Sequence, residues 1–314
     1  MSNFTGALLA ELVRAGIVES VHNGHLALIN SDGSVRAAIG DIDATMYPRS
    51  SIKSFQAAAM VRHGLKLNPQ QLAIVCASHS GSAEHFAVVE SILHGAGLTV
   101  MDLRNTPDVP LGRAERQSWG SNPPSQIAPG CSGKHAGMLA TCVINGWETD
   151  SYLDPEHPLQ IAIRQEIQSL IGESVISTTI DGCGAPLFAI TTQKFAQGAH
   201  KMRISSDPFY QEVIAACLAH PEMVAGVGRL TTTLMKSVPG LFIKDGAEAV
   251  ELLSLPDGRA CVFKVSDGSD RAFPTILKAV LAAWDIDVTI DPVLVRGGSH
   301  ITGEIRVSNS LTQL

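Results

Sequence analysis

A serine and a lysine three residues apart stand at the start of an apolar, helix-forming run. In the segment RSSIK at residues 49–53, the side chains of Ser50 and Lys53 share one face if the segment is helical. A serine hydroxyl is a poor nucleophile at neutral pH, but a lysine amine that is kept neutral by burial or by other cations can take its proton. The spacing therefore favours amide attack by Ser50, although it also occurs by chance where a solvated lysine follows a helix cap.

Two further motifs follow in a meaningful order. Ser78 opens a Ser-His-Ser segment, and Lys244 opens a Lys-Asp-Gly segment at the end of a predicted strand. This order resembles the Ser-x-x-Lys, Ser-x-Asn and Lys-Thr-Gly motifs of serine β-lactamases and penicillin-binding proteins. A second hydroxyl can relay a proton, and a second lysine can lower the pKa of its neighbour. Taken singly, Ser78 also suits a helix-entry turn and Lys244 a surface position.

Cysteines in two glycine-bracketed segments form another constellation. Cys131, Lys134 and His135 belong to CSGKH, and Asp181 and Cys183 belong to DGCG. Two cysteines are too few for a structural zinc site, which needs four ligands, so the pattern allows only a catalytic or accessory zinc with two thiolates and one nitrogen. Lysine is a rare ligand because the metal must displace its proton. A phosphate loop is rejected, because His135 stands where Ser or Thr is required.

The elements that must position these residues run strand, helix, strand along the chain. The spacing predicts a hairpin over 25–39, a helix over about 50–63 and a proline-rich loop over 105–129. Further predicted elements are helices over 83–94, 134–145, 159–171, 209–218 and 273–284 and strands over 240–244, 248–253, 259–265 and 301–307. We expect one catalytic unit, 1–314, of the α/β (α+β) class. Its ends, 1–48 and 236–314, form an antiparallel sheet beside a helix-rich middle, 49–235.

Composition excludes several classes of protein. The chain has 314 residues, of which 45% are hydrophobic and 17% charged, which is typical of a globular protein. The net charge of −7 and the lack of a basic run argue against nucleic acid as a partner. No window of about 18 apolar residues predicts a membrane span, and the N-terminus does not resemble a signal peptide. Six scattered cysteines indicate reduced thiols, so we expect a cytoplasmic protein.

Five ordered blocks resemble the Rhizobium etli-type L-asparaginases, also called class 3 asparaginases. The blocks are MYPRSSIKSFQ from Met46, CASHSG from Cys76, CSGKHAGML from Cys131, DGCGAP from Asp181 and HPEMVAG from His220. The resemblance extends over nearly the whole chain. The paired threonine motifs of the ordinary bacterial asparaginases and the threonine-nucleophile pattern of the plant type are both absent from the sequence.

The resemblance implies a reaction, a fold and a set of site residues. It implies hydrolysis of L-asparagine to L-aspartate and ammonia by a homodimer with a serine β-lactamase- or glutaminase-like fold. It also implies a zinc ion that assists substrate binding without activating water. The implied catalytic residues are Ser50 with Lys53 and Ser78 with Lys244, and the implied zinc ligands are Cys131, Lys134 and Cys183.

The expected mechanism is acyl transfer through serine. Lys53 takes the proton of Ser50, which attacks the side-chain amide, and the Ser78–Lys244 pair protonates the leaving ammonia. Which serine attacks is left open. Asp181 is a candidate partner for the substrate ammonium, and Arg49 or His135 is a candidate for its carboxylate or for a supporting role.

Two departures from the family pattern leave these residues intact. Ser54 stands where many members have proline, and residues 128–130 (APG) stand where some have a cysteine. Two alternatives also remain. One is another serine amidohydrolase, such as a glutaminase or a β-lactamase-like enzyme. The other is a zinc-dependent binding or sensory protein with an inactive site, although the intact Ser-Lys pairs argue against it.

Overall fold

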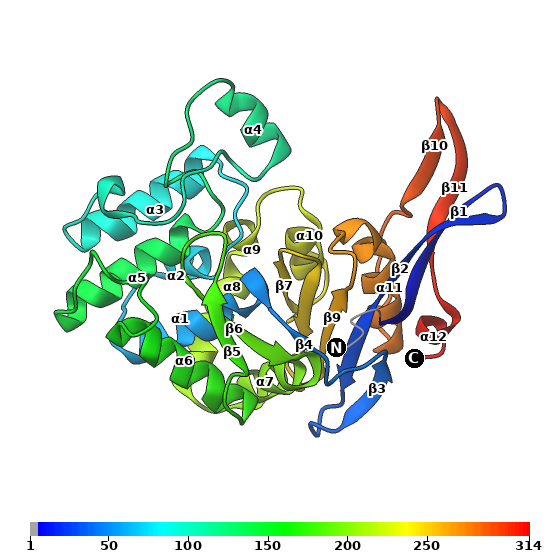
Figure 1. Cartoon of the computed structure of the whole chain (residues 1–314), viewed down its shortest axis with the longest axis horizontal. Helices are drawn as coiled ribbons and strands as arrows, with labels where there is room; N and C mark the ends of the chain where they lie inside the picture. The colour runs from blue at the N-terminus through cyan, green and yellow to red at the C-terminus, as the bar shows by residue number, and fades with distance from the viewer. Residues whose placement is uncertain (1–5) are drawn as a thin grey trace.

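The computed structural model describes residues 6–314, and its largest element is a curled antiparallel sheet (Figure 1). Eight strands form it in the order β10-β11-β1-β2-β9-β8-β7, with β3 paired to β2 beside this path. The strands are β1 Ala7–Arg14, β2 Ile17–Ile29, β3 Val35–Ile39, β7 Phe242–Gly246, β8 Val250–Ser254, β9 Ala260–Val265, β10 Leu294–Gly297 and β11 His300–Val307. The sheet thus combines both ends of the chain, and the predicted α/β (α+β) class is confirmed.

The hairpin predicted over 25–39 and the strands predicted over 248–253 and 259–265 are confirmed, because turn residues of the right type stand between the paired strands. Between β2 and β3, Gly33 adopts φ +85° and the Asp32 carboxylate accepts the backbone N–H of Ser34. Between β8 and β9, Gly258 adopts φ +92°. A left-handed conformation at these positions costs glycine little, whereas other residues resist it.

Helices occupy most of the middle of the chain. They are α1 Lys53–Arg62, α2 Pro69–Val75, α3 Ala83–Gly95, α4 Arg113–Trp119, α5 Ser132–Asn145, α6 Pro158–Ile171, α7 Thr192–Ile204, α8 Pro208–Ala219, α9 Pro221–Val224, α10 Leu230–Ser237, α11 Phe273–Ala283 and α12 Asn309–Thr312. Three 3₁₀ turns accompany them: η1 Arg49–Ile52, η2 Val100–Asp102 and η3 Asp270–Ala272. The Ser82 side chain caps the start of α3, and α5 and α6 end at Gly146 and Gly172 in the left-handed conformation.

The middle is less purely helical than the sequence predicted. A small antiparallel sheet, β4-β6-β5, forms from Thr45–Met46, Pro186–Thr191 and Ser177–Ile180. Its β-branched residues are a strand signal that the helical prediction overlooked. The loop predicted over 105–129 contains α4, whose seven residues lie between Gly112 and Gly120.

The helical lobe packs on the large sheet chiefly through α7, which contacts β2, β8 and β9. Helix α11 instead packs on β1 and β11. In Figure 1 the outer part of the sheet, with β10, β11 and the tip of the β1–β2 hairpin, extends away from the helices. At the junction of lobe and sheet, η1 contacts β7 and β8, which brings the Ser-x-x-Lys segment to the strand that carries Lys244. In the described part of the chain, no helix is long and apolar enough to span a membrane.

Candidate active site

A cavity of about 410 Å³ lies where η1, the loop after α2, the start of α5 and the end of β7 meet. The predicted residues that line it are Arg49, Ser50, Lys53, Ser78, Cys131, Asp181 and Cys183. Lys244 is fully buried behind Ser78 and reaches it by a hydrogen bond of 2.8 Å. Residues that are far apart in sequence therefore converge on one cavity.

Ser50 sits in η1, directly after a residue with an unusual backbone. Arg49 adopts φ +52°, which is uncommon for a residue with a side chain and marks local strain. Its guanidinium Nε donates to the Asp181 carboxylate at 2.7 Å, an ion pair that helps to hold this conformation. Within residues 6–314 the Ser50 hydroxyl makes no hydrogen bond, so it is free to face a substrate in the cavity.

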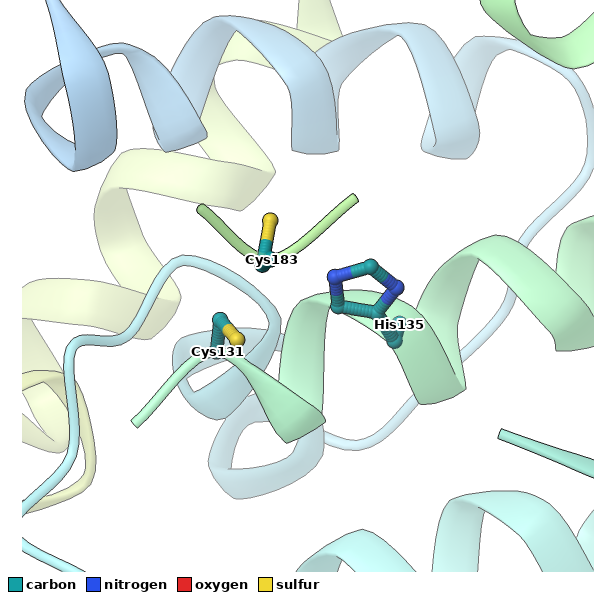
Figure 2. Close-up of side chains that lie close together, drawn as sticks. All are labelled: Cys131, His135 and Cys183. Carbon is teal, nitrogen blue, oxygen red and sulfur yellow. The ribbon is translucent and has the colours of Figure 1, made fainter. Parts of the chain in front are cut away.

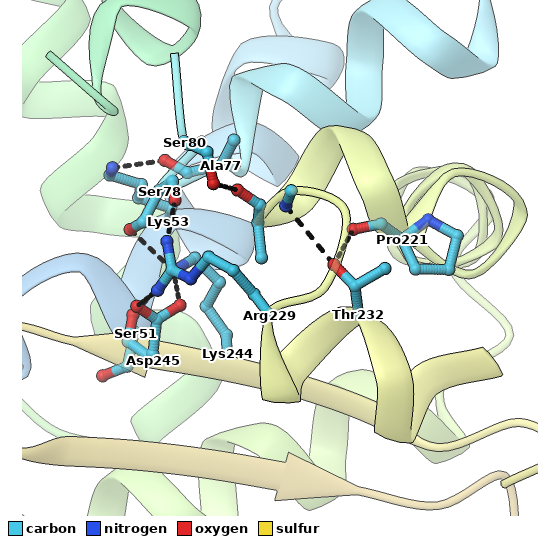
Figure 3. Close-up of polar contacts among 12 residues, drawn as sticks. Ser51, Lys53, Ala77, Ser78, Ser80, Pro221, Arg229, Thr232, Lys244 and Asp245 are labelled. Atoms are coloured by element: carbon cyan, nitrogen blue, oxygen red, sulfur yellow. Dashed lines mark hydrogen bonds and ion pairs between the residues drawn. The ribbon is translucent and has the colours of Figure 1, made fainter. Parts of the chain in front are cut away.

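Lys53 is 2% exposed, and its amine donates to the Ala77 carbonyl (Figure 3). Burial lowers the pKa of Lys53 to about 8; the nearby Cys131 opposes this shift, and the charge of Lys244 adds to it. A neutral amine has two N–H donors and one lone pair. The contact with Ala77 uses one donor, which leaves the lone pair to act as a base.

Ser78 lies in a network of ionised groups that the sequence did not predict as a set. The Lys244 amine donates to the Ser78 hydroxyl and to one carboxylate oxygen of Asp245, both at 2.8 Å. The Arg229 guanidinium donates to the Ser78 carbonyl at 2.8 Å and to the other Asp245 oxygen at 2.9 Å. Burial raises the pKa of Asp245, but Lys244 and Arg229 outweigh it and hold that pKa well below its usual range.

The glycine of the Lys-Asp-Gly segment has a local structural reason. A Cβ atom at Gly246 would lie 2.7 Å from the Pro48 carbonyl oxygen and 3.0 Å from the Ser51 amide nitrogen. Glycine is thus needed for β7 to approach η1, which brings Lys244 and Ser50 to the same cavity. The glycine is therefore explained by the close packing of two segments of this protein.

A second glycine, Gly226, fits the loop before α10 against Ser80. Gly226 adopts φ +142°, and a Cβ there would lie 2.1 Å from the Ser80 hydroxyl oxygen. We expect Gly226→Ala to lower the free energy of unfolding by about 1–3 kcal/mol. Gly228→Ala is the matched control, because Gly228 has φ +79° but open space around its Cβ, and it should cost about 1 kcal/mol. Urea titration measures both, and equal losses would contradict the steric argument.

The two glycine-bracketed cysteines meet His135 beside the cavity (Figure 2). The sulfur atoms of Cys131 and Cys183 and a ring nitrogen of His135 lie within 4.8 Å of one another. Lys134 donates to the Cys183 sulfur at 3.2 Å. The predicted set of Cys131, Lys134 and Cys183 is thus brought together, and the structure adds His135, which the sequence had suggested only for a carboxylate or a supporting role.

The cluster carries separated charges. A hydrogen bond with Cys131, together with Lys134 and His135, holds the pKa of Cys183 well below its usual range in spite of burial. The same hydrogen bond, with burial, raises the pKa of Cys131 well above its usual range. Burial lowers the pKa of Lys134, but the two cysteines outweigh it, so the net shift is upward. A thiolate, a thiol and an ammonium thus lie together next to the cavity.

The ring of His135 is oriented as in a metal ligand. Nδ1 of His135 contacts the Tyr152 hydroxyl at 2.8 Å, and Nε2 is buried with no hydrogen-bond partner among residues 6–314. A second hydrogen bond of this kind fixes the ring of many metal-bound histidines. Two sulfurs and an unpartnered imidazole nitrogen are donors that suit zinc. The residues present therefore fit such an ion.

Some residues near the motifs lie outside the cavity. His79 contacts the Ser132 hydroxyl at 2.8 Å and stacks on His85, which caps α3 with Ser82. Sequence reasoning missed Arg229 and Tyr152 and gave Asp245 no role, although Asp245 follows the predicted Lys244. No local pattern marks Arg229 or Tyr152, because their partners are distant in sequence.

Comparison with known proteins places this chain in a family. A model of the L-asparaginase II family matches residues 10–296. A search of curated proteins gave no match. Similar solved structures include a beta-lactamase from Mycobacterium bovis, 17% identical over 83% of this chain and 94% of its own, with a TM-score of 0.39. A Bacillus glutaminase is 12% identical over 85% and 92% of the two chains, with a TM-score of 0.39. Because the family model covers most of its length, this protein belongs to the L-asparaginase II family and is an amidohydrolase.

Proposed function

We propose that this protein is an L-asparaginase that hydrolyses L-asparagine to L-aspartate and ammonia through a serine nucleophile. The observation that supports this most is the convergence of Ser50, Lys53 and Ser78 on one cavity, with Lys244 bonded to Ser78. An amide needs a nucleophile, a base for its proton and an acid for the leaving nitrogen. The two Ser-Lys pairs can supply all three.

In the first step, the neutral Lys53 amine takes the proton of Ser50 while the Ser50 oxygen bonds to the side-chain amide carbon. The carbonyl electrons move to oxygen and form an oxyanion, which the positive charge of Lys244 and nearby backbone N–H groups stabilise. The carbon–nitrogen bond then breaks, the nitrogen receives a proton, and ammonia leaves. Water attacks the resulting ester and releases aspartate.

Recognition of the amino-acid end falls to two charged groups that also line the cavity. Asp181 can accept the substrate ammonium. Only Nε of Arg49 is used in the ion pair with Asp181, so its terminal nitrogens are available for the carboxylate. The pair thus offers opposite charges to a zwitterion.

Zinc is the proposed cofactor, held by Cys131 and Cys183 with nitrogen donors from Lys134 and His135. When bound it would supply a fixed positive charge that orients the polar end of the substrate. Lys134 and Cys131 must lose their protons to bind a metal, so binding should release protons to the buffer. The orphaned Nε2 of His135 is the feature of the chain that fits this ion best.

The ligand set can be tested by the amount of metal bound. We expect Cys131→Ser and Cys183→Ser to lose bound zinc, and their KM for asparagine to rise more than kcat falls. His135→Gln should lower zinc affinity by about 10–100-fold. Equilibrium dialysis with zinc measures each variant, with Cys142→Ser as the control, since Cys142 is buried on α5 away from the cluster. Full zinc occupancy in Cys183→Ser would contradict the assignment.

The substrate is tested by coupled detection of ammonia from L-asparagine, with and without added zinc, beside L-glutamine and a chromogenic β-lactam. We expect the highest kcat/KM for asparagine. One methylene group is worth about 1–3 kcal/mol, so slower release from glutamine is also expected. Cleavage of the β-lactam without asparagine hydrolysis would overturn the proposal. We further propose a homodimer, which light scattering after gel filtration would test.

A further inference from the structure

The second serine, Ser78, and three residues around it form a closed circuit of hydrogen bonds (Figure 3). The Lys244 amine joins the Ser78 hydroxyl to one oxygen of Asp245. Arg229 joins the other oxygen of Asp245 back to the Ser78 carbonyl. The circuit therefore binds Ser78 through both its side chain and its backbone. Each of the four hydrogen bonds has a donor–acceptor distance of 2.8 or 2.9 Å.

We propose that Arg229 and Asp245 are positioning residues that hold Lys244 as an ammonium beside Ser78, so that this pair serves as proton donor and cation in the first step while Lys53 serves as the base for Ser50. The inference deepens the proposed function and rests on it for its catalytic meaning. It assigns different protonation states to Lys53, which lines the cavity, and to Lys244, which lies buried behind Ser78.

Counting donors carries the first step. The Lys244 amine contacts three acceptors: the Ser78 hydroxyl, the Asp245 carbonyl at 2.6 Å and the Asp245 carboxylate at 2.8 Å. An ammonium has three N–H donors and satisfies all three acceptors. A neutral amine has two, and it would satisfy the same contacts only by accepting the Ser78 hydroxyl proton, so the direct contact with the ionised Asp245 carboxylate favours the ammonium. Lys244 consequently has no lone pair with which to take the proton of Ser78.

The same contact fixes the direction of the Ser78 hydroxyl. Because its oxygen accepts from Lys244, its hydrogen is free to point into the cavity that Ser78 lines. When the leaving nitrogen takes that hydrogen, Lys244 can pass one of its own protons to the serine oxygen. The balance is one proton from Lys244 to ammonia through Ser78, and the incoming water later returns one.

The charges around Lys244 agree with this assignment. The facing groups are Asp245 on β7, Arg229 before α10, Lys53 on α1, Glu251 on β8 and Cys217 on α8. Asp245 is ionised. Burial, with the charge of Asp245, raises the pKa of Glu251 well above its usual range, and the Cys76 contact and burial raise that of Cys217. Asp245 is therefore the one anion among these facing groups, and it contacts Lys244 directly.

Arginine is suited to its place in the circuit. Its planar fork presents two nitrogens at a fixed separation, so Arg229 can hold a carbonyl and a carboxylate at once. A lysine at this position would keep the charge but could not fix both partners. The backbone N–H of Ser80 donates to the Ala225 carbonyl. This hydrogen bond holds the loop before α10, and with it Arg229, next to Ser78.

A titration that needs no substrate tests the protonation state. With ¹⁵N-labelled lysine, NMR follows the Lys244 amine in the wild type and in Asp245→Asn, with assignment by Lys244→Arg. We expect the titration midpoint of Lys244 to fall by about 1–3 pH units in Asp245→Asn. An unchanged midpoint would overturn the proposal, whether or not asparagine is the substrate.

Glu251→Gln is the matched control. Glu251 lies opposite Asp245 on the neighbouring strand and is 1% exposed. Its substitution by glutamine replaces a carboxyl group with an amide, as Asp245→Asn does. Because its carboxyl is already neutral, the midpoint of Lys244 should move by less than about half a pH unit. An equal shift in both variants would mean that burial rather than ion pairing controls Lys244, and would refute the circuit.

Steady-state kinetics provide a second test, and the variant Arg229→Lys can be measured even if Asp245→Asn does not fold. Arg229→Lys keeps the positive charge, and we expect its kcat to fall at least tenfold with a KM within twofold of the wild type. In Asp245→Asn the alkaline limb of the pH–rate profile should move to lower pH by the shift seen in the titration. A kcat for Arg229→Lys equal to that of the wild type would show that Arg229 does not position the pair.

Discussion

Replacement of Ser50 with alanine is expected to lower kcat for asparagine hydrolysis by at least about 10⁴-fold while the protein stays folded. The Ser50 hydroxyl lines the cavity and makes no hydrogen bond within residues 6–314. Ser78 is less suited to attack, because its oxygen accepts from Lys244 and is thereby made less basic. The adjacent Ser51 is buried and donates to the Pro48 carbonyl, so it faces away from the chemistry.

The matched control for this change is Ser54→Ala. Ser54 is one turn further along, fully buried, and its hydroxyl has no partner in the described chain, so its loss should leave kcat within twofold. Ser78→Ala should retain more activity than Ser50→Ala, because it removes a proton relay worth about 10²–10⁴-fold rather than the nucleophile. Residual activity of Ser50→Ala above that of Ser78→Ala would reverse the two roles.

A chemical label separates the serines without kinetics. A fluorophosphonate probe reacts with activated serine hydroxyls, and peptide mass spectrometry locates the modified residue. We expect modification at Ser50 in the wild type and none in Ser50→Ala. Labelling at Ser78 in the wild type would sink the assignment of Ser50 as nucleophile.

The site residues that belong to short local motifs could be predicted from the sequence, whereas those defined by contacts between distant segments could not. Ser50 and Lys53 are three residues apart, and the blocks that resemble the asparaginases carry the other candidates except Lys244, which stands at the end of a predicted strand. The circuit partner Arg229 could not be found in this way, since it contacts Ser78 across 151 residues and follows a loop with no distinctive spacing. Roles that depend on tertiary contacts leave little trace in a single sequence.

The same distinction between local patterns and long-range contacts holds for the fold. Helices with a clear apolar stripe and glycine ends, such as α5 and α6, were predicted nearly to the residue. The small sheet β4-β6-β5 was missed because its strands are short and the first has only two residues. Pairing of β1 with β11 joins the two ends of the chain, and no local signal specifies that register.

The ion pair of Arg49 and Asp181 shows why structure was needed for the electrostatics. Both were predicted as separate substrate contacts, and the structure places them against each other at 2.7 Å. The substrate must then meet a pair that is already neutralised, which favours a zwitterion over a simple anion. Paired charges in the cavity also cost less to desolvate than isolated ones.

Lys53 carries the second large prediction. Lys53→Met is expected to lower kcat/KM by about 10²–10⁴-fold, because the base for Ser50 is lost. Lys53→Arg keeps a charge that cannot be released, so it should be as inactive as the methionine variant. In the wild type, kcat/KM should rise with pH and level off above about 8, where the Lys53 amine becomes neutral. High activity in Lys53→Arg would show that charge, not proton transfer, is what Lys53 contributes.

The same lysine should leave a signature in stability. Its pKa is lowered by burial from 10.5 in the unfolded chain to about 8 in the folded one. Between these values the unfolded chain binds a proton that the folded chain lacks, so the free energy of unfolding should rise with pH by up to about 3 kcal/mol. Lys53→Met has no such group, and its stability should stay flat over this window and exceed that of the wild type near pH 7. Urea titrations at pH 7 and pH 10 measure the difference, and parallel curves for the two proteins would mean that Lys53 is not a lysine kept neutral for catalysis.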